Sequence, residues 1–555
     1  MNEMTLQESV QIKDLVPRDG EAAREIGFTV PEVYNASAIL FDNMDKGLAD
    51  KVAVYSDAGN ITYGALCRDA CRYGNAMLSL GLMRGDRVLI VLNDGPAYPA
   101  AAFGAIRAGL APVFLNTQSP PDLLHYYAEN SGARACVTQP EFLDAFGSED
   151  WSTTSLEAVI LTEGTGTETV PGLASANISI LGPDAVTGAS DQLDAADTGR
   201  DDMAFWMYSS GSTGRPKAVV HLHHDMLYTA ISYADRVLGI EPDDICFSVP
   251  KIYFAYGFGN SITFPFHAGA STMLFAGRPT PDKIFEQIAR HRPTLFFALP
   301  TVYTAMIKAP ESEGADLASV RRCISAAEIL SQDVFGAWEN RFGHRIIEGL
   351  GSTEVLHIYL SNTIEQQKPG SAGQRVPGYE TKLTDRDGNP VATGEEGILW
   401  VRGDSNAPCY WNRPDKTAET MRDGWIWTGD RFVMDEDGFF FFKGRADDLI
   451  KVSGQWVYPL EVELCLNEHP KVMECAVMGL PLADGRMTLA AAIAPMPGIE
   501  GGDALGKELK AYTQDKLLPY KYARQVIYMN TLPKTGTDKI DRQACKRALE
   551  ETLQQ

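Results

Sequence analysis

The chain has 555 residues, with 49 lysines and arginines against 73 aspartates and glutamates, which gives a formal net charge of −24 at pH 7. With 45% hydrophobic and 22% charged residues, the composition is that of a globular protein and excludes a mainly disordered or fibrous chain. Such an acidic chain is also a poor general binder of nucleic acid or anionic membrane, because both require positive surface. A local basic pocket for one small anion is compatible with this charge.

The length corresponds to about three or four folding units, or to fewer large ones. The first 20 residues hold charged side chains and no apolar segment, so we expect no secretory signal. No segment approaches the roughly 18 consecutive apolar residues of a membrane span. The nine cysteines form no CxxC pair, which indicates neither a disulfide framework nor a zinc site. We therefore expect a reduced, soluble, cytoplasmic protein that is a monomer or homodimer.

The first clear strand is the apolar segment Val88–Leu92, which is typical of a strand buried on both faces. An alanine-rich helix, Pro99–Ala108, and a second short strand, Ala111–Leu115, follow it. This order predicts a parallel sheet covered by helices. Residues 162–202 are rich in Gly, Thr, Ser and Asp, so we expect a surface excursion that ends before a strand at Met203–Met207.

The helix and strand rhythm recurs between residues 284 and 307, and from about Gly370 it gives way to short β-like pieces separated by Gly, Asp and Pro. The last part predicts a compact segment of helices and strands that begins with the helix Pro459–Asn467. We therefore predict an α/β fold with a large N-terminal domain, residues 1–446, of helix-covered sheets plus a small β region. A small, mobile α+β domain would occupy residues 447–555.

The most specific motif, SSGSTGRPK at residues 209–217, follows the predicted strand Met203–Met207. Its glycines let backbone N–H groups approach an anion, its hydroxyls add donors, and Lys217 adds positive charge. The pattern predicts a phosphate-binding loop. It differs from the P-loop of kinases and GTPases because Ala218, not Ser or Thr, follows the lysine. Residues 257–259 lack the third glycine of a dinucleotide fingerprint, which disfavours a NAD site.

This motif resembles the phosphate loop of the adenylate-forming superfamily, which includes acyl-CoA synthetases, adenylation domains of peptide synthetases and luciferases. Further motifs similar to those of the superfamily occur in the same order. They are GSTE at 351–354, WTGD at 427–430, GRADD at 444–448 with Lys451 and Gly454 after it, and LPKTGTDKI at 532–540. The resemblance spans roughly residues 50–545, and by it the chain is identified as a member of the superfamily.

The resemblance implies roles for individual residues. Thr353 would contact the α-phosphate, and Glu354 would hold Mg²⁺, for which a carboxylate is a suitable hard ligand. Lys539 would neutralise charge as the carboxylate of the acid attacks the α-phosphorus and pyrophosphate leaves. Asp447 would lie at a hinge and Gly454 at the coenzyme A tunnel. The implied ATP-binding residues are Ser209, Ser210, Gly211, Ser212, Thr213, Gly214, Lys217, Ala327, Glu328, Asp430 and Arg445.

Another group of residues bears on which acid is activated. Phe254 stands where peptide-synthetase domains usually supply an aspartate for the α-ammonium group, so amino acids are disfavoured. The segments 251–260 and 351–362 resemble benzoate–CoA ligases and related aryl-CoA ligases. By that resemblance the acid pocket is lined by Ala255, Tyr256, Ala326, Gly351, His357 and Ile358. Small residues leave a flat slot, Tyr256 and Ile358 give apolar walls, and His357 gives one polar contact.

We therefore predict an AMP-forming ligase that uses ATP, Mg²⁺ and coenzyme A to activate a small aromatic acid such as benzoate. The N-terminal domain would bind ATP and the acid, and the C-terminal domain would carry the catalytic lysine. Small alicyclic or short aliphatic acids remain as alternatives. The rival functions are a luciferase-like oxygenase, a loader of carrier proteins and a non-catalytic acyl-adenylate binder.

Three positions depart from the pattern of the family. Ala218 and Ala327 replace glycines, and Asp538 replaces the glycine that usually precedes the catalytic lysine. Asp538 would place a negative charge beside Lys539. The methyl group of Ala327 would narrow the slot at a ligand-facing turn, and a change of that size is worth about 1–3 kcal/mol in substrate discrimination.

Three histidines, His221, His223 and His224, follow the phosphate loop closely. A histidine cluster is a potential metal site, but Lys217 lies in the same motif and no carboxylate or thiolate spacing accompanies it. We therefore do not expect these histidines to bind a metal.

Overall fold

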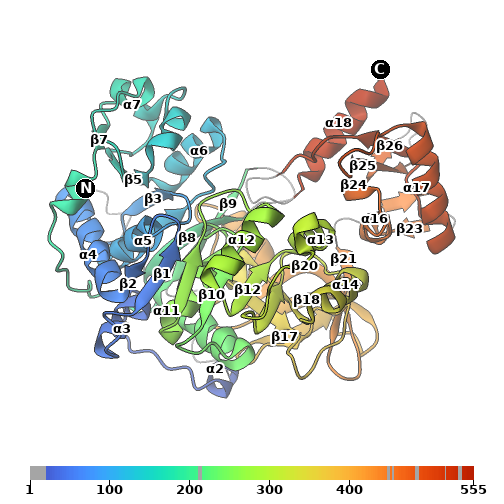
Figure 1. The fold of residues 1–555 in the computed structure, drawn as a ribbon, viewed down its shortest axis with the longest axis horizontal. Helices are drawn as coiled ribbons and strands as arrows, with labels where there is room; N and C mark the ends of the chain where they lie inside the picture. The colour runs from blue at the N-terminus through green and yellow to red at the C-terminus, as the bar shows by residue number, and fades with distance from the viewer. Residues whose placement is uncertain are drawn as a thin grey trace. The chain divides into compact units, whose positions relative to one another are not determined.

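The computed structural model describes residues 21–209, 215–446, 450–452, 455–481, 487–518, 520–534 and 540–554. The chain divides into two compact units (Figure 1). The first comprises Met1–Leu330, Val334–Thr381 and Trp400–Trp427, and the second comprises Ser331–Asp333, Lys382–Leu399 and Thr428–Gln555. The domain boundary expected after residue 446 lies inside the second unit and stays a prediction.

A seven-stranded sheet of the first unit has the order β7-β6-β5-β3-β4-β8-β9, and its pairs are parallel except for β8 with β9. Alternate residues of β3 enter two different cores, Val88 and Ile90 in one, Leu89 and Val91 in the other, so helices cover both faces. The strands are β3 (Arg87–Val91), β4 (Ala111–Phe114), β5 (Ala135–Thr138), β6 (Ala158–Leu161), β7 (Ser179–Leu181), β8 (Met203–Ser209) and β9 (Lys217–Leu222).

The predicted strand, helix and strand of residues 88–115 are confirmed as β3, α5 (Ala97–Arg107) and β4. The expectation of a surface excursion over residues 162–202 was wrong in one respect. This segment contributes the edge strand β7, which pairs in parallel with β6, and two short helices, α7 (Pro171–Ser175) and α8 (Asp184–Thr187). A strand of three residues is too short to produce a readable period among so many Gly, Thr and Ser residues.

A nine-stranded sheet of the same unit has the order β16-β15-β14-β13-β12-β10-β11-β1-β2. The neighbours from β1 to β14 are parallel, whereas β2, β15 and β16 are antiparallel to their neighbours. The carboxyl ends of β10, β12, β13 and β14 therefore meet at one edge. The strands are β1 (Val52–Ser56), β2 (Ile61–Thr62), β10 (Ile245–Ser248), β11 (Ser271–Leu274), β12 (Leu295–Ala298), β13 (Arg322–Ser325), β14 (Ile346–Gly351), β15 (Ile358–Ser361) and β16 (Gln374–Arg375).

Helices fill the spaces around these two sheets. Several of them, including α6, α12 and α13, begin at a proline, whose fixed φ and missing N–H suit the first turn of a helix. The longer helices are α3 (Ala38–Asp45), α4 (Tyr63–Ser79), α6 (Pro121–Ser131), α9 (His223–Thr229), which continues as η3 (Ala230–Leu238), α12 (Pro281–His291), α13 (Pro300–Lys308) and α14 (Gln332–Phe342). Among the described residues, no helix is both long enough and apolar enough to cross a membrane.

The second unit contains β21 (Phe440–Arg445), which pairs antiparallel with β20 (Trp425–Met434), as the predicted small β region requires. The strands β17 (Glu380–Thr384) and β18 (Glu396–Arg402) come before them in the chain. The C-terminal part has a sheet of order β23-β22-β25-β24 with β26 beside β25. Its elements are β22 (Ile450–Val452), β23 (Gln455–Val457), α16 (Pro459–Asn467), β24 (Val472–Pro481), β25 (Met487–Pro495), α17 (Asp503–Lys516), β26 (Gln525–Tyr528) and α18 (Arg542–Gln554).

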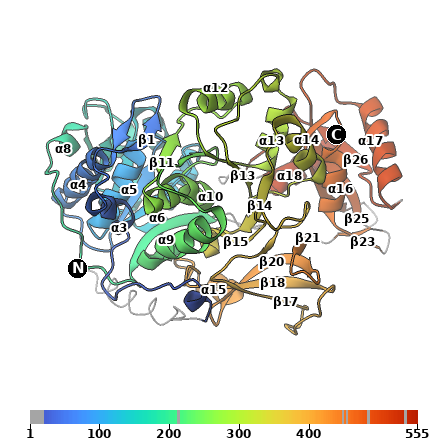
Figure 2. The same ribbon diagram turned by 60° about the horizontal axis from the view of Figure 1, so that its bottom comes forward.

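Helices α4 and α5 lie side by side in both views (Figure 1 and Figure 2). A pair of glycines permits this close approach. A Cβ atom at Gly104 of α5 would lie 2.3 Å from the carbonyl oxygen of Ala70 and 2.9 Å from the amide nitrogen of Gly74, both in α4. Since these are backbone atoms of a buried helix, they cannot move aside without repacking the core.

We therefore expect Gly104→Ala to lower the free energy of unfolding by about 1–3 kcal/mol, as overpacking of a tight core does. Urea unfolding measures the change. Gly336→Ala in α14 is the matched control, because no atom lies within 4 Å of its added Cβ and alanine favours a helix. That control should be neutral or slightly stabilising, and an equal loss in both variants would contradict the packing argument.

Candidate active site

The two ends of the predicted phosphate loop lie next to each other. Ser209 ends β8, Lys217 begins β9, and these residues are directly opposed in the antiparallel pair. Because β8 runs parallel to β4, the loop leaves the sheet at its carboxyl edge, where α/β proteins usually bind ligands. The middle of the loop lies outside the described residues; it comprises Ser210, Gly211, Ser212, Thr213 and Gly214.

The carboxylate of Glu354 is the centre of the polar contacts at this edge. Glu354 belongs to the short turn η6 (Thr353–Val355), which connects β14 to β15 in the other sheet. Its Oε1 accepts a hydrogen bond from Ser209 Oγ at 3.0 Å and another from the Tyr410 hydroxyl at 2.8 Å. Lys217 Nζ lies 4.0 Å from the centroid of the Tyr410 ring. The structure thus brings together Ser209 and Lys217 of one predicted motif and Glu354 of another.

The surroundings of Glu354 decide its charge. Burial alone would raise the pKa of this carboxyl group, but the charge of Lys217 and the hydrogen bonds from Tyr410 and Ser209 hold the pKa below its ordinary value. The hydrogen bonds from Ser209 and Tyr410 both reach Oε1. An ionised oxygen ligand beside a lysine and a serine hydroxyl fits a Mg²⁺ ion that accompanies a polyphosphate.

Tyr410 is a part of the site that the sequence motifs did not reveal. It arrives through an antiparallel bridge to Val219 of β9, and the next residue, Trp411, donates its backbone N–H to Ala218 O at 2.9 Å. This pairing joins residues almost 200 positions apart, so no local pattern marks it. Ala218, one of the three departures, is buried in the core, where its methyl group packs with apolar side chains.

The residues of the predicted acid pocket come from neighbouring strand ends. Ala326 directly follows β13, Gly351 ends β14, and Ile358 begins the antiparallel β15, so all three lie at one edge of the nine-stranded sheet. Gly351 and Ile358 are directly paired, and a Cβ at Gly351 would lie 2.4 Å from the carbonyl oxygen of His357. The strand pairing itself therefore requires glycine at position 351.

His357 and Tyr256 lie together in this pocket, with ring centroids 5.7 Å apart. Ala255 and Tyr256 begin α10 (Ala255–Phe258), and the backbone carbonyl of Tyr256 lies 3.3 Å from His357 Nε2. Burial lowers the pKa of His357 to about 3 and raises the pKa of Tyr256, so both rings are neutral near pH 7. Two neutral aromatic rings, His357 buried and Tyr256 half-buried, make a predominantly apolar wall with few polar atoms.

Ala327 and Glu328 follow in the turn after β13. Ala327 is exposed and has φ of +71°, a left-handed conformation in which a Cβ atom is strained. A glycine, which the family resemblance leads one to expect at this position, would adopt this conformation without strain. Glu328 Oε2 accepts the backbone N–H of Thr301 at 3.2 Å, which ties the turn to the start of α13.

Asp430 and Arg445 belong to the second unit. They are directly opposed across β20 and β21, and Arg445 Nη1 lies 3.1 Å from Asp430 Oδ1. The same guanidinium donates to the carbonyl oxygen of Thr428 at 3.0 Å. The structure thus brings this predicted pair together as a partly exposed ion pair. Three further predicted residues, Asp447, Gly454 and Lys539, lie outside the described residues, as does Asp538.

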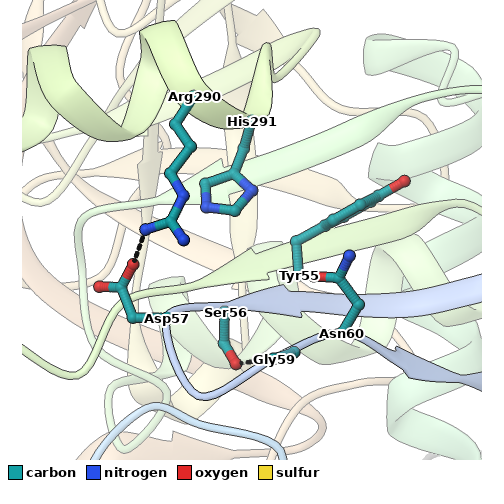
Figure 3. A pocket seen from close by; sticks show the side chains of 7 residues that line it. All are labelled: Tyr55, Ser56, Asp57, Gly59, Asn60, Arg290 and His291. Atoms are coloured by element: carbon teal, nitrogen blue, oxygen red, sulfur yellow. Dashed lines mark hydrogen bonds and ion pairs between the residues drawn. The ribbon is translucent and has the colours of Figure 1, made fainter.

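A polar pocket of about 450 Å³ lies elsewhere in the first unit (Figure 3). Its lining residues come from the end of β1, the turn after it and the end of α12; they are Tyr55, Ser56, Asp57, Gly59, Asn60, Arg290 and His291. Arg290 Nη1 donates to Asp57 Oδ1 at 2.8 Å within it. The predicted site residues are absent from this lining, so the pocket is separate from the site at the strand ends.

The ends of the predicted phosphate loop, the ionised carboxylate of Glu354 and the predicted aromatic slot are features that an enzyme adenylating a small acid would need. Comparison with known families supports this class. Residues 41–411 match the AMP-binding enzyme family, and residues 461–539 match the AMP-binding enzyme C-terminal domain. The chain belongs to the AMP-binding enzyme family.

Individual relatives are aryl-CoA ligases. The chain is 40% identical over 516 residues to a benzoate–CoA ligase of Thauera aromatica, covering 92% of this chain and 96% of the relative. It is 39% identical to a 4-hydroxybenzoate–CoA/benzoate–CoA ligase of Rhodopseudomonas palustris, covering 92% and 93%. A benzoate CoA ligase structure from Burkholderia xenovorans superimposes with a TM-score of 0.81 at 36% identity, covering 92% of this chain and 100% of that one.

An anthranilate CoA ligase in complex with anthranoyl-AMP is also similar in structure, with a TM-score of 0.88 at 33% identity. The match covers 97% of this chain and 100% of that chain. The predicted α/β fold and the predicted membership of the adenylate-forming enzymes are thereby confirmed.

The strain at Ala327 leads to a stability prediction. We expect Ala327→Gly to raise the free energy of unfolding by about 0.5–1 kcal/mol, because relief of the left-handed strain exceeds the entropy that glycine adds to the unfolded chain. Denaturant unfolding measures this. Ala418→Gly in α15 (Pro414–Thr420), also exposed, is the matched control and should lose about 1 kcal/mol. A loss in both variants would show that Ala327 is unstrained in solution.

Proposed function

We propose that this enzyme is an AMP-forming acid–CoA ligase whose acid is benzoate or a closely similar small aromatic acid. The overall reaction converts ATP, the acid and coenzyme A into the acyl-CoA, AMP and pyrophosphate. The observation that carries the proposal is 40% identity to a benzoate–CoA ligase over 92% of the chain. The neutral aromatic slot formed by Tyr256 and His357 supports it.

The slot favours a flat acid without a charge other than its carboxylate. Both aromatic rings are neutral, and Phe254 supplies no carboxylate for an ammonium group. An unpaired ammonium in such surroundings would lose its hydration without compensation, which disfavours amino acids. Ala255, Ala326 and Gly351 leave room for a ring, and Ile358 adds an apolar wall.

In the first half-reaction the carboxylate of the acid attacks the α-phosphorus of ATP. The donors and positive charge of the Ser209–Lys217 loop hold the phosphates, and Thr353 contacts the α-phosphate. Glu354, ionised and partly exposed, would hold Mg²⁺, which offsets the negative charge of the phosphates. Ala327 and Glu328 contribute to the nucleotide pocket.

The remaining assignments concern the second unit and the thiol step. Asp430 and Arg445 bind the ribose of ATP, since a carboxylate accepts both hydroxyl groups. Lys539 stabilises the charge that develops in the first half-reaction. The domain 447–555 then rotates about Asp447, so that Lys539 leaves the site and the coenzyme A tunnel near Gly454 takes its place. The acyl-adenylate is thereby opened to the thiol of coenzyme A. We expect the enzyme to act in the cytoplasm, as a monomer or a homodimer.

A panel of acids tests the proposed substrate. Pyrophosphate release is measured with benzoate, hydroxybenzoates, cyclohexane carboxylate and short aliphatic acids, with and without coenzyme A. We expect the highest kcat/KM for benzoate or a lightly substituted benzoate, and AMP release that depends on coenzyme A. A preference for an aliphatic or alicyclic acid would overturn the substrate assignment but leave the ligase class intact.

The role of the C-terminal lysine gives a separate prediction. Lys539→Ala should reduce acid-dependent adenylation by roughly 100-fold or more, because it removes a positive charge needed in the transition state. Thioester formation from supplied acyl-adenylate and coenzyme A should largely survive. Lys534→Ala, a change in the same motif at a lysine that pairs with Glu474, serves as the control and should leave adenylation within a few-fold. Equal loss of both half-reactions in Lys539→Ala would refute the assigned role.

A further inference from the structure

The turn that carries Thr353 and Glu354 is held through its backbone from outside. Each of its three successive carbonyl oxygens has a partner elsewhere in the first unit. The contacts are His221 Nε2 to Thr353 O at 2.8 Å, the Ala407 N–H to Glu354 O at 2.8 Å, and Ser405 Oγ to Val355 O at 2.9 Å. Of these partners, His221 is the one whose side chain contacts Thr353, which the prediction places next to the α-phosphate of ATP.

The turn needs such support because its own geometry is unfavourable. Leu356, the next residue, has φ of +72°, which a branched side chain adopts only under strain. Inside the turn the hydrogen bonds are few; Leu356 N donates to Thr353 O at 3.1 Å, and Val355 N donates to Ser352 O at 3.3 Å. A strained conformation persists where the surrounding structure fixes it.

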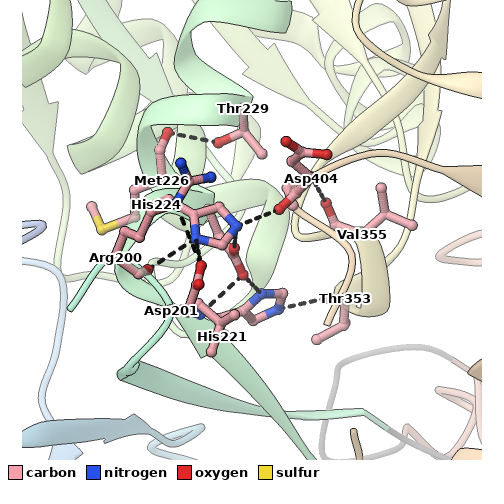
Figure 4. Close-up of polar contacts among 12 residues, drawn as sticks. Arg200, Asp201, His221, His224, Met226, Thr229, Thr353, Val355 and Asp404 are labelled. Carbon is pink, nitrogen blue, oxygen red and sulfur yellow. Dashed lines mark hydrogen bonds and ion pairs between the residues drawn. The ribbon is translucent and has the colours of Figure 1, made fainter. Parts of the chain in front are cut away.

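His221 is itself held in place by a buried carboxylate. Its Nδ1 lies 2.8 Å from Asp225 Oδ2, one turn further along the chain, and the same oxygen accepts the Leu222 N–H at 3.0 Å. Both side chains are fully buried. In Figure 4 one dashed line joins the His221 ring to Thr353, and a second dashed line marks its contact with the carboxylate of Asp225.

A second imidazole completes the arrangement. His224 Nε2 lies 2.7 Å from the carbonyl oxygen of Asp404 and 3.3 Å from Asp225 Oδ1. Its Nδ1 lies 2.9 Å from the carbonyl oxygen of Arg200 and 3.3 Å from Asp201 Oδ1 (Figure 4). Because Asp404 directly precedes Ser405, the same cluster fixes the segment that holds the Val355 carbonyl.

The chemistry of these contacts assigns the protons. The backbone carbonyl oxygens of Thr353, Arg200 and Asp404 only accept hydrogen bonds, so His221 Nε2 and both ring nitrogens of His224 act as donors. For His224, burial alone would lower the pKa, but Asp201 and Asp225 raise it to about 9. Buried polar groups that hold one another through several such contacts make a rigid support.

We propose that His221, oriented by Asp225 and braced by His224, is a positioning residue that sets the Thr353–Glu354 turn for binding ATP with Mg²⁺. This inference rests on the proposed function, since it assumes that the turn binds the nucleotide. His221 also lies in β9, whose first residue is Lys217. The strand β9 therefore connects the predicted phosphate loop of the seven-stranded sheet to the Thr353–Glu354 turn of the nine-stranded sheet.

The test is a comparison of three variants in binding and in kinetics. In His221→Ala the dissociation constant for MgATP, measured by calorimetry without any acid, should rise roughly 10-fold or more, as loss of a buried hydrogen bond predicts. The KM for the acid should change less than about 2-fold, because Gly351 and Ile358 hold that side of the pocket by strand pairing. In His221→Gln an amide still donates to the Thr353 carbonyl, so most of the affinity should return.

His223→Ala is the matched control, because His223 is equally buried and is two residues away. Its Nδ1 accepts the Ala36 N–H at 3.0 Å and so supports the N-terminal segment. This variant should lose stability but keep its MgATP affinity. Hydrogen exchange at residues 354–357 should quicken in His221→Ala and not in His223→Ala. Unchanged MgATP affinity in His221→Ala, or an equal loss in His223→Ala, would overturn the proposal.

Three further outcomes are distinguishable. Should His221→Ala fail to fold, His221→Phe replaces it, since the ring keeps its approximate shape and loses both nitrogens; normal MgATP affinity in that variant overturns the proposal. Should the wild-type enzyme bind MgATP but activate no aromatic acid, the proposed substrate fails while the positioning role is still measured. Failure of the wild-type enzyme to bind MgATP would overturn both.

Discussion

The site depends on one interaction, the contact of the Glu354 carboxylate with Ser209 and Tyr410. Ser209 ends a strand of the seven-stranded sheet, whereas Glu354 lies on a turn of the nine-stranded sheet, so this contact fixes one sheet edge against the other. A carboxylate can stay ionised in partly buried surroundings only with a compensating charge and hydrogen bonds. Lys217 supplies that charge, and the residue that neutralises the carboxylate is also the cation of the phosphate loop.

The arrangement follows from the direction of the strands. The predicted phosphate loop follows β8, the residues of the predicted acid pocket follow β10, β13 and β14, and the turn η6 connects β14 to β15. Parallel strands present their carboxyl ends at one edge, where backbone groups are left to bind ligands. Residues as far apart in the chain as Ser209 and Glu354 can therefore share a site without any long loop, and small residues such as Gly351 keep the pairing close.

Sequence patterns predicted site residues where the pattern is local. The hydroxyl-rich loop, the Thr353–Glu354 pair and the pocket residues each lie in short motifs whose residue types state their chemistry. Tyr410 and the donor role of His221 were not predictable, because each depends on pairing between segments more than 100 residues apart. The edge strand β7 was missed because three residues show no period, and the strain at Ala327 is a property of the backbone that its side chain does not reveal.

The net charge of −24 has to be reconciled with substrates that are anions. At physiological ionic strength the Debye length is about 8 Å, so most surface carboxylates are screened from a bound nucleotide. Binding is then decided by groups within a few ångströms of the nucleotide. At the predicted site the nearest such charges are Lys217, the last residue of the loop, and the Glu354 carboxylate that it stabilises. Next to the turn, the buried Asp225 lies between the two histidines, and Asp201 lies beyond His224. Because the polar groups of this cluster contact one another, they contribute rigidity to the site. The attraction for phosphate comes from the predicted phosphate loop.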